Sequence, residues 1–123
     1  MGSASAGARP ARAVSPVHLP NANVFLIHSA LGQAWADNTY ATLMTGVSWR
    51  TASIQMFGRR IPSPRLTAWV GDHAYTYSRL TWPPARWGKT LLAIRQRVED
   101  LTGTSFNGVL LNLYRDGRDS MGW

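Results

Sequence analysis

The stretch near the end of the chain constrains the fold most, because an apolar run there leads straight into a polar turn. Residues 109–111 (Val-Leu-Leu) precede Asn112 and Tyr114, and residues 115–117 (Arg-Asp-Gly) follow. This pattern predicts a strand over residues 106–114. Residues two apart on a strand point to the same face, so one amide and one phenol are expected to converge on a ligand. Taken alone, the pair is better explained as two polar side chains facing water.

The rest of the chain predicts helices first and strands afterwards. One helix is expected to be capped by Ser29 and to end at Gly46, and another to run from about residue 89 to 101 before Gly103. Residues 58–65 contain two prolines and are predicted to form a loop. This order favours an α+β fold over a parallel α/β sheet. Extended segments are expected at residues 23–27, 49–57, 66–70, 75–78 and 106–114.

Composition limits the classes of protein that the chain can belong to. Its 123 residues suffice for one small domain with a core. The absence of cysteine excludes a disulfide-linked partner and a thiolate metal site, and fits a reducing, cytoplasmic location. No apolar stretch approaches the roughly 18 residues that span a bilayer. Residues 1–18 lack the apolar core of a secretory signal and are expected to be a flexible basic lead-in, with an organellar transit peptide as the alternative.

The charge points to a polyanionic partner. The net charge is +7, and 12 of the 13 basic residues are arginine. No acidic residue lies between Asn38 and Gly71, a window that contains four arginines. The planar guanidinium group can grip phosphate with two hydrogen bonds and stack on bases. An arginine-rich composition that only keeps the protein soluble would look the same, so charge alone leaves both interpretations open.

An aromatic residue at a turn lies beside several guanidinium groups. Met56 and Phe57 are followed by Arg59 and Arg60, and Arg65 comes a few residues later. An exposed ring flanked by arginines suits wedging into a stack of bases, with the arginines holding the backbone on either side. The local pattern by itself favours a different interpretation, in which Phe57 is a core residue at the end of a strand.

Two tyrosines alternate in residues 75–78 (Tyr-Thr-Tyr-Ser), so Tyr75 and Tyr77 are expected on one face. An enzyme that acts on a base must hold it out of the stack between aromatic faces and polar groups. The commoner arrangement is a half-buried strand with tyrosine hydroxyls at its rim. Asp72 and His73 are adjacent and would point apart, and no His, Asp or Glu residues show a convincing metal-ligand spacing.

Four blocks in this order resemble the AlkB family of iron(II)/2-oxoglutarate dioxygenases, which remove alkyl groups from nucleic-acid bases. The resemblance covers about Leu19 to Trp123. It implies an α+β fold made of the N-terminal helices and first strands of a double-stranded β-helix (jelly-roll), incomplete at the C-terminus. Residues 19–123 would then supply the nucleotide-recognition region and the first core strand. The blocks are residues 57–59, 64–69, 75–78 and 106–117.

The resemblance implies a role for each block. Asn112 and Tyr114 match the residues that hydrogen-bond 2-oxoglutarate. Tyr77 would stack on the flipped base, with Tyr75 and Ser78 as its hydrogen-bonding partners. Arg79 departs from the family, which usually has glycine at this position. The residues expected to contact nucleic acid are Met56 and Phe57 as the intercalating finger, Arg59, Arg60, and Arg65 near the damaged nucleotide.

The function implied by the resemblance is oxidative dealkylation of nucleic-acid bases, with DNA favoured over RNA and with Fe(II) and 2-oxoglutarate as cofactors. In the relatives that it resembles most, an iron-binding His-x-Asp pair would begin at the residue after Trp123. We therefore expect the chain to be the N-terminal part of such an enzyme, to bind no iron by itself and to be inactive alone. One alternative is a truncated, non-catalytic nucleic-acid-binding module. Another is an unrelated scaffold fold, if the four blocks are coincidence.

Overall fold

The computed structural model describes residues 12–77 and 79–121. These residues fall into two compact units, divided between Asn38 and Thr39. In the first unit, β1 (Val14–Leu19) and β2 (Ala22–Ile27) pair as an antiparallel hairpin. Proline at position 20 suits the first turn position, and Asn21 takes the left-handed conformation with φ 56°. Because this turn pairs the two strands, residues 14–18 form a strand where a flexible lead-in was predicted.

The first helix, α1 (Gln33–Gly46), continues from the first unit into the second. It ends at Gly46 as predicted, but it begins later than expected. Ser29 has φ 49°, and its carbonyl accepts a bond from the Gly32 amide in a turn. A helix cap requires an extended backbone, so Ser29 does not cap α1.

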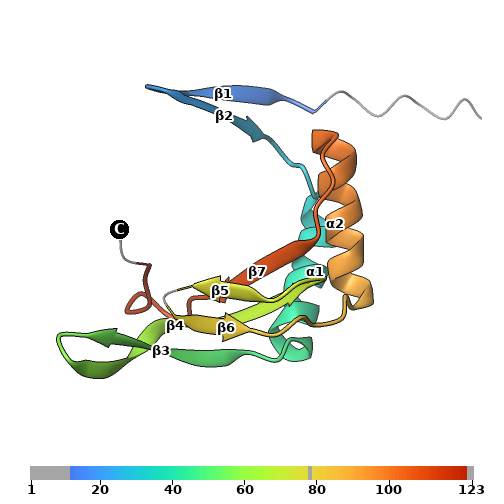
Figure 1. The fold of residues 1–123 in the computed structure, drawn as a ribbon. Coiled ribbons are helices and arrows are strands. Elements are labelled where there is room, and N and C mark those ends of the chain that lie inside the picture. The colour runs from blue at the N-terminus through green and yellow to red at the C-terminus, as the bar shows by residue number, and fades with distance from the viewer. Residues whose placement is uncertain (1–11, 78, 122–123) are drawn as a thin grey trace, which may run out of the picture. The chain divides into compact units, whose positions relative to one another are not determined.

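A three-stranded antiparallel sheet of order β3-β4-β7 organises the second unit (Figure 1). Its strands are β3 (Arg50–Met56), β4 (Arg59–Gly71) and β7 (Gly108–Leu113). The predicted loop over residues 58–65 was wrong, because β4 runs through both prolines. Strand β7 pairs only with residues 66–71, so the first half of β4, which holds both prolines, pairs with β3 alone. The register of the β3–β4 pairing also shifts between Thr51 and Ser53, opposite this half. Proline is tolerated at such edges and irregularities.

The remaining elements lie between β4 and β7 in sequence. Strands β5 (Tyr75–Tyr77) and β6 (Leu80–Trp82) form a short antiparallel hairpin, of which β6 was not predicted. Helix α2 (Lys89–Thr102) ends at Gly103, whose φ of 68° confirms the predicted stop. The predicted C-terminal strand is confirmed as β7, although Tyr114 lies one residue beyond its end.

The core lies on one face of the sheet. Ala68 of β4 and Leu111 of β7 are cross-strand partners and pack with Leu91 of α2, and Leu43 of α1 joins the cluster. The opposite face carries the alternate residues, among them the pair Thr67 and Asn112. The α+β class is confirmed by the two helices and the antiparallel strands of the described residues, whereas the jelly-roll stays an expectation. No helix in the described ranges is long and apolar enough to cross a membrane.

Candidate functional site

Phe57 lies at the tip of the β3–β4 hairpin and is exposed to solvent. Met56 pairs with Arg59, which leaves a two-residue turn of Phe57 and Gly58 with φ of 52° and 71°. Positive φ at both positions is the pattern of a type I′ turn. The Phe57 side chain is 95% exposed, so the core interpretation of this residue is wrong. A bulky residue in the left-handed region is rare, so this ring is held out at a cost in backbone strain.

Two arginines follow the tip on β4. Arg59 and Arg60 lie opposite Met56 and Gln55 of β3, and both are exposed. Within the part of the chain that the structure describes, neither guanidinium group has a hydrogen-bond or ion-pair partner. The hairpin therefore presents one aromatic ring and two available cations to solvent.

Arg65, farther along β4, has a different environment. It is half-buried, its Nε donates to Asn112 Oδ1 at 3.1 Å, and its Nη1 donates to the Ser120 carbonyl at 3.3 Å. These bonds engage Arg65 within the protein and connect it to the strand that carries the predicted cofactor residues. The predicted contact between Arg65 and nucleic acid stays a prediction.

The predicted cofactor pair lies at the end of β7. Asn112 is half-buried opposite Thr67. Its Oδ1 is occupied by Arg65, but its Nδ2 has no hydrogen-bond partner among residues 12–77 and 79–121. Tyr114 lies just past the strand and is 44% exposed. An amide N–H and a phenol are thus available as donors at this end of the sheet.

Ion pairs fold the loop that follows Tyr114. Arg115 donates from its backbone N and its Nε to Asp119 Oδ2, at 2.8 and 2.7 Å, and from Nη2 to Oδ1 at 3.0 Å. These hydrogen bonds from Arg115 lower the pKa of Asp119 from 3.8 to about 2. A second pair joins Arg118 to Asp116 at 2.9 Å. The sequence had indicated only a polar turn here.

The same loop is tied to β4. The Ser120 backbone N donates to the Pro64 carbonyl at 2.9 Å, next to the bond from Arg65 to the Ser120 carbonyl. These two hydrogen bonds hold the loop after β7 against Pro64 and Arg65.

The two tyrosines of β5 have different surroundings. Tyr75 stacks on Trp69 of β4, with ring centroids 4.8 Å apart and an interplanar angle of 23°. Tyr77 is 59% exposed and free to stack on a ligand. On β6, Trp82 lies under the guanidinium group of Arg50 at 5.7 Å. Ser78, the third predicted member of the base pocket, lies outside the described residues.

Trp69 is a residue that sequence reasoning missed. Its Nε1 donates to the His73 carbonyl at 2.8 Å, and its ring supports Tyr75. Two glycines leave room for the indole: a Cβ at Gly108 would lie 2.3 Å from Trp69 Cη2, and one at Gly71 would lie 2.7 Å from Cζ2. The glycines are cross-strand partners at the ends of β4 and β7. These strand-end glycines were the available signal in the sequence.

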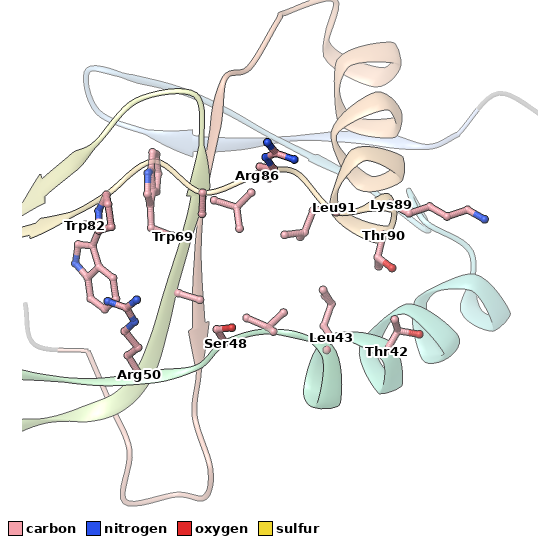
Figure 2. A pocket seen from close by; sticks show the side chains of 17 residues that line it. Thr42, Leu43, Ser48, Arg50, Trp69, Trp82, Arg86, Lys89, Thr90 and Leu91 are labelled. Atoms are coloured by element: carbon pink, nitrogen blue, oxygen red, sulfur yellow. The ribbon is translucent and has the colours of Figure 1, made fainter.

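A cavity of about 380 Å³ lies on the helical side of the second unit (Figure 2). Leu43 of α1 and Leu91 of α2 point toward one another across it, and Arg50 lies against Trp82 at one end, whereas Lys89 points away. None of the predicted base-pocket or cofactor residues lines this cavity. Its largely apolar interior continues the core, and we assign it no role in the site.

In residues 12–77 and 79–121 there is no group of three or more His, Cys, Asp or Glu side chains that could hold a metal ion. The residues present there therefore do not fit an iron site.

No family model matches the chain. It is 49% identical over 89 residues to the Homo sapiens protein named alpha-ketoglutarate-dependent dioxygenase alkB homolog 3, a match that covers 72% of this chain. The matched part of this chain belongs to the AlkB family. It is also 41% identical over 96 residues to the Mus musculus DNA oxidative demethylase ALKBH2, over 74% of this chain.

The match covers only part of these AlkB relatives. The chain spans 31% of the length of the human alkB homolog 3 and 40% of the mouse ALKBH2. A third AlkB relative, the Bos taurus alkB homolog 3, is 40% identical over 89 residues, and the chain again spans 31% of its length. The AlkB family predicted from the sequence is thus confirmed for the matched region.

Proposed function

We propose that this chain forms the base-recognition region and part of the 2-oxoglutarate site of an AlkB-type oxidative demethylase that acts on nucleic acid, with DNA as the favoured substrate. The names of the relatives, an alpha-ketoglutarate-dependent dioxygenase and a DNA oxidative demethylase, support this assignment. The observation that carries it is Phe57, an exposed ring held at a strained hairpin tip beside two available arginines. A ring in this position has no packing role within the described structure.

In this proposal, the hairpin opens the stack of bases. The Phe57 ring enters the gap that an extruded base leaves, and Arg59 and Arg60 contact the phosphates on either side. Base–aromatic stacking contributes on the order of 1–3 kcal/mol, which offsets much of the cost of unstacking. Met56, exposed beside Phe57, extends the apolar surface of the finger.

The extruded base is held by the β5 segment. Tyr77 stacks on the base, because its ring is exposed, and Tyr75 and Ser78 supply hydrogen bonds to its edge. Trp69 supports Tyr75 from the sheet side through the stacked contact at 4.8 Å. The tyrosines thereby exclude water from one face of the base.

The cofactor is held at the end of β7. The free Nδ2 of Asn112 and the Tyr114 hydroxyl donate hydrogen bonds to 2-oxoglutarate, whose carboxylates accept them. When bound, 2-oxoglutarate would be oxidised and would supply two of the four electrons that reduce dioxygen, the oxidant, while the alkyl group supplies the other two. This chain's residues bind and orient that cofactor beside the base.

The proposal is tested by the variant Phe57→Asn. Asparagine tolerates positive φ and suits a type I′ turn, so the hairpin keeps its shape while the ring is lost. Binding to a fluorescein-labelled duplex with one N-methylated base is expected to weaken roughly 5- to 150-fold, the equivalent of losing one stacked base. Fluorescence anisotropy measures this change.

A matched control removes a different exposed ring. Phe25 on β2 is also exposed, so Phe25→Asn deletes an aromatic ring from the other unit. Its affinity for the duplex is expected to stay within about twofold of the unchanged chain. Equal losses in the two variants, or no effect of Phe57→Asn, would refute the role of Phe57 as the finger.

A further inference from the structure

We propose that Arg65 is a positioning residue, which sets the orientation of the Asn112 side-chain amide so that its N–H groups face 2-oxoglutarate. This inference rests on the proposed function, because it assumes that Asn112 contacts the cofactor. It gives Arg65 a role distinct from the nucleic-acid contact that the sequence predicted.

The sheet register brings the two residues together. Thr67 of β4 is the cross-strand partner of Asn112, and Arg65 lies two residues before Thr67 on the same face. Diagonal neighbours of this kind are within reach of a long side chain. The Nε–H of Arg65 accordingly reaches Asn112 Oδ1 at 3.1 Å, although the residues are 47 positions apart in sequence.

The chemistry of the two groups allows only one orientation of the amide. An arginine side chain has donors and no acceptor, so it can bond to the amide oxygen but not to the amide nitrogen. If the Asn112 amide turned over, its NH₂ group would face the guanidinium group and this bond would be lost. In the observed orientation Nδ2 has no partner in the described residues and remains available as a donor. A dicarboxylate cofactor requires such a donor and would be repelled by Oδ1.

A second bond fixes the plane of the guanidinium group. Its Nη1 donates to the Ser120 carbonyl at 3.3 Å, and the Ser120 N is held by the Pro64 carbonyl at 2.9 Å. Two bonds through different nitrogens of a planar group restrict its rotation more than one bond can. Lysine carries a single nitrogen without this planar fork, so it cannot reproduce the arrangement.

The test uses the whole 123-residue chain labelled with ¹⁵N, and follows the Asn112 side-chain NH₂ signals by NMR while 2-oxoglutarate is added into the millimolar range. In the unchanged chain these signals are expected to shift with the cofactor. In Arg65→Gln, which loses the charge, and Arg65→Lys, which keeps it, the apparent affinity is expected to fall about tenfold or more. The backbone signals of Ala68 and Leu111 report whether the sheet stays folded.

A matched control separates orientation from charge. Arg86→Gln removes one positive charge from an exposed arginine that has no assigned role. Its affinity for 2-oxoglutarate is expected to stay within about twofold of the unchanged chain. If Arg86→Gln weakens binding as much as Arg65→Gln does, the effect is general charge attraction and the positioning role is overturned.

The remaining outcomes distinguish this inference from the proposed function. Unchanged 2-oxoglutarate affinity in both Arg65 variants would overturn the positioning role and leave the cofactor site standing. An Asn112 signal that does not respond to 2-oxoglutarate in the unchanged chain would overturn the cofactor assignment itself, and this inference with it. A response of the unchanged chain that both Arg65 variants lose supports the inference.

Discussion

At the scale of single residues, Phe57 combines three properties that rarely occur together. Its ring is bulky, its side chain is 95% exposed, and its backbone lies in the left-handed region with φ 52°. Strain of this kind costs on the order of 1–3 kcal/mol and is concentrated at functional sites. Glycine or asparagine would be less strained at this turn position. The turn geometry therefore does not explain why phenylalanine is present, whereas a function of its ring does.

Asp119 makes the loop after β7 sensitive to acid. Its pKa is about 2 in the folded chain, against 3.8 without the hydrogen bonds from Arg115. Because the folded pKa is the lower one, the ion pair stabilises the loop fully above pH 3.8, and this contribution is lost as the pH falls toward 2. We expect the Arg115 backbone amide signal to change with a midpoint near pH 2, as measured by an NMR pH titration.

Asp119→Asn provides the control for this titration. The variant has no carboxyl group at position 119, so the acid transition of the Arg115 amide is expected to disappear. A midpoint at or above 3.8 in the unchanged chain would show that the Arg115–Asp119 hydrogen bonds do not form in solution.

At the scale of elements, the β5–β6 hairpin is placed on β4 by aromatic contacts. Trp69 stacks on Tyr75, and Arg50 of β3 lies over Trp82. The indole of Trp69 fits only because Gly71 and Gly108 have no side chains. The position of the proposed base-holding tyrosines thus depends on a glycine pair in the main sheet.

The variant Gly108→Ala tests this dependence. The added Cβ would lie 2.3 Å from the Trp69 ring, so the indole must move. Overpacking of this kind costs about 1–3 kcal/mol, and we expect a loss of that size in the free energy of unfolding measured with urea. The near-ultraviolet circular dichroism of the Trp69–Tyr75 pair should weaken as well.

Gly117→Ala serves as the matched glycine control. A Cβ at Gly117 meets nothing within 4 Å, so its effect on stability is expected to stay within about 0.5 kcal/mol. If Gly108→Ala lowered the free energy of unfolding no more than this control does, the glycine pair would not be needed to accommodate the Trp69 indole.

At the scale of the whole molecule, the charge is suited to a polyanion. The net charge is +7, and the tip of the β3–β4 hairpin carries arginines without partners in the described ranges. Charge of this kind releases counterions from nucleic acid on binding. A module that only recognised a neutral surface would show little dependence on salt.

Salt titration gives the corresponding prediction. The logarithm of the affinity for duplex DNA is expected to fall linearly with the logarithm of the salt concentration. Arg59→Gln removes one proposed phosphate contact and should reduce the magnitude of this slope by roughly 0.9. Anisotropy titrations at several salt concentrations measure both slopes, and an unchanged slope would argue against a phosphate contact by Arg59.

Local patterns in the sequence predicted several elements correctly. Helix α2 and its stop at Gly103, the end of α1 at Gly46, and the strand that carries Asn112 all depend on nearby residues. The strand β1 and the first half of β4 were missed. Both contain prolines, whose effect depends on which side of the strand has a neighbour, and this is not a local property.

For the candidate site too, some features follow from local sequence and others depend on the tertiary structure. The sequence by itself determined which residue types are present: the aromatic ring and arginines that we propose contact nucleic acid, and the amide and phenol that we propose bind a dicarboxylate. Only the tertiary structure decided that Phe57 points into solvent, that Trp69 supports Tyr75, and that Arg65 turns to Asn112. The physical reason is that composition and periodicity act over a few residues, whereas these contacts depend on turn geometry and on pairing between distant strands.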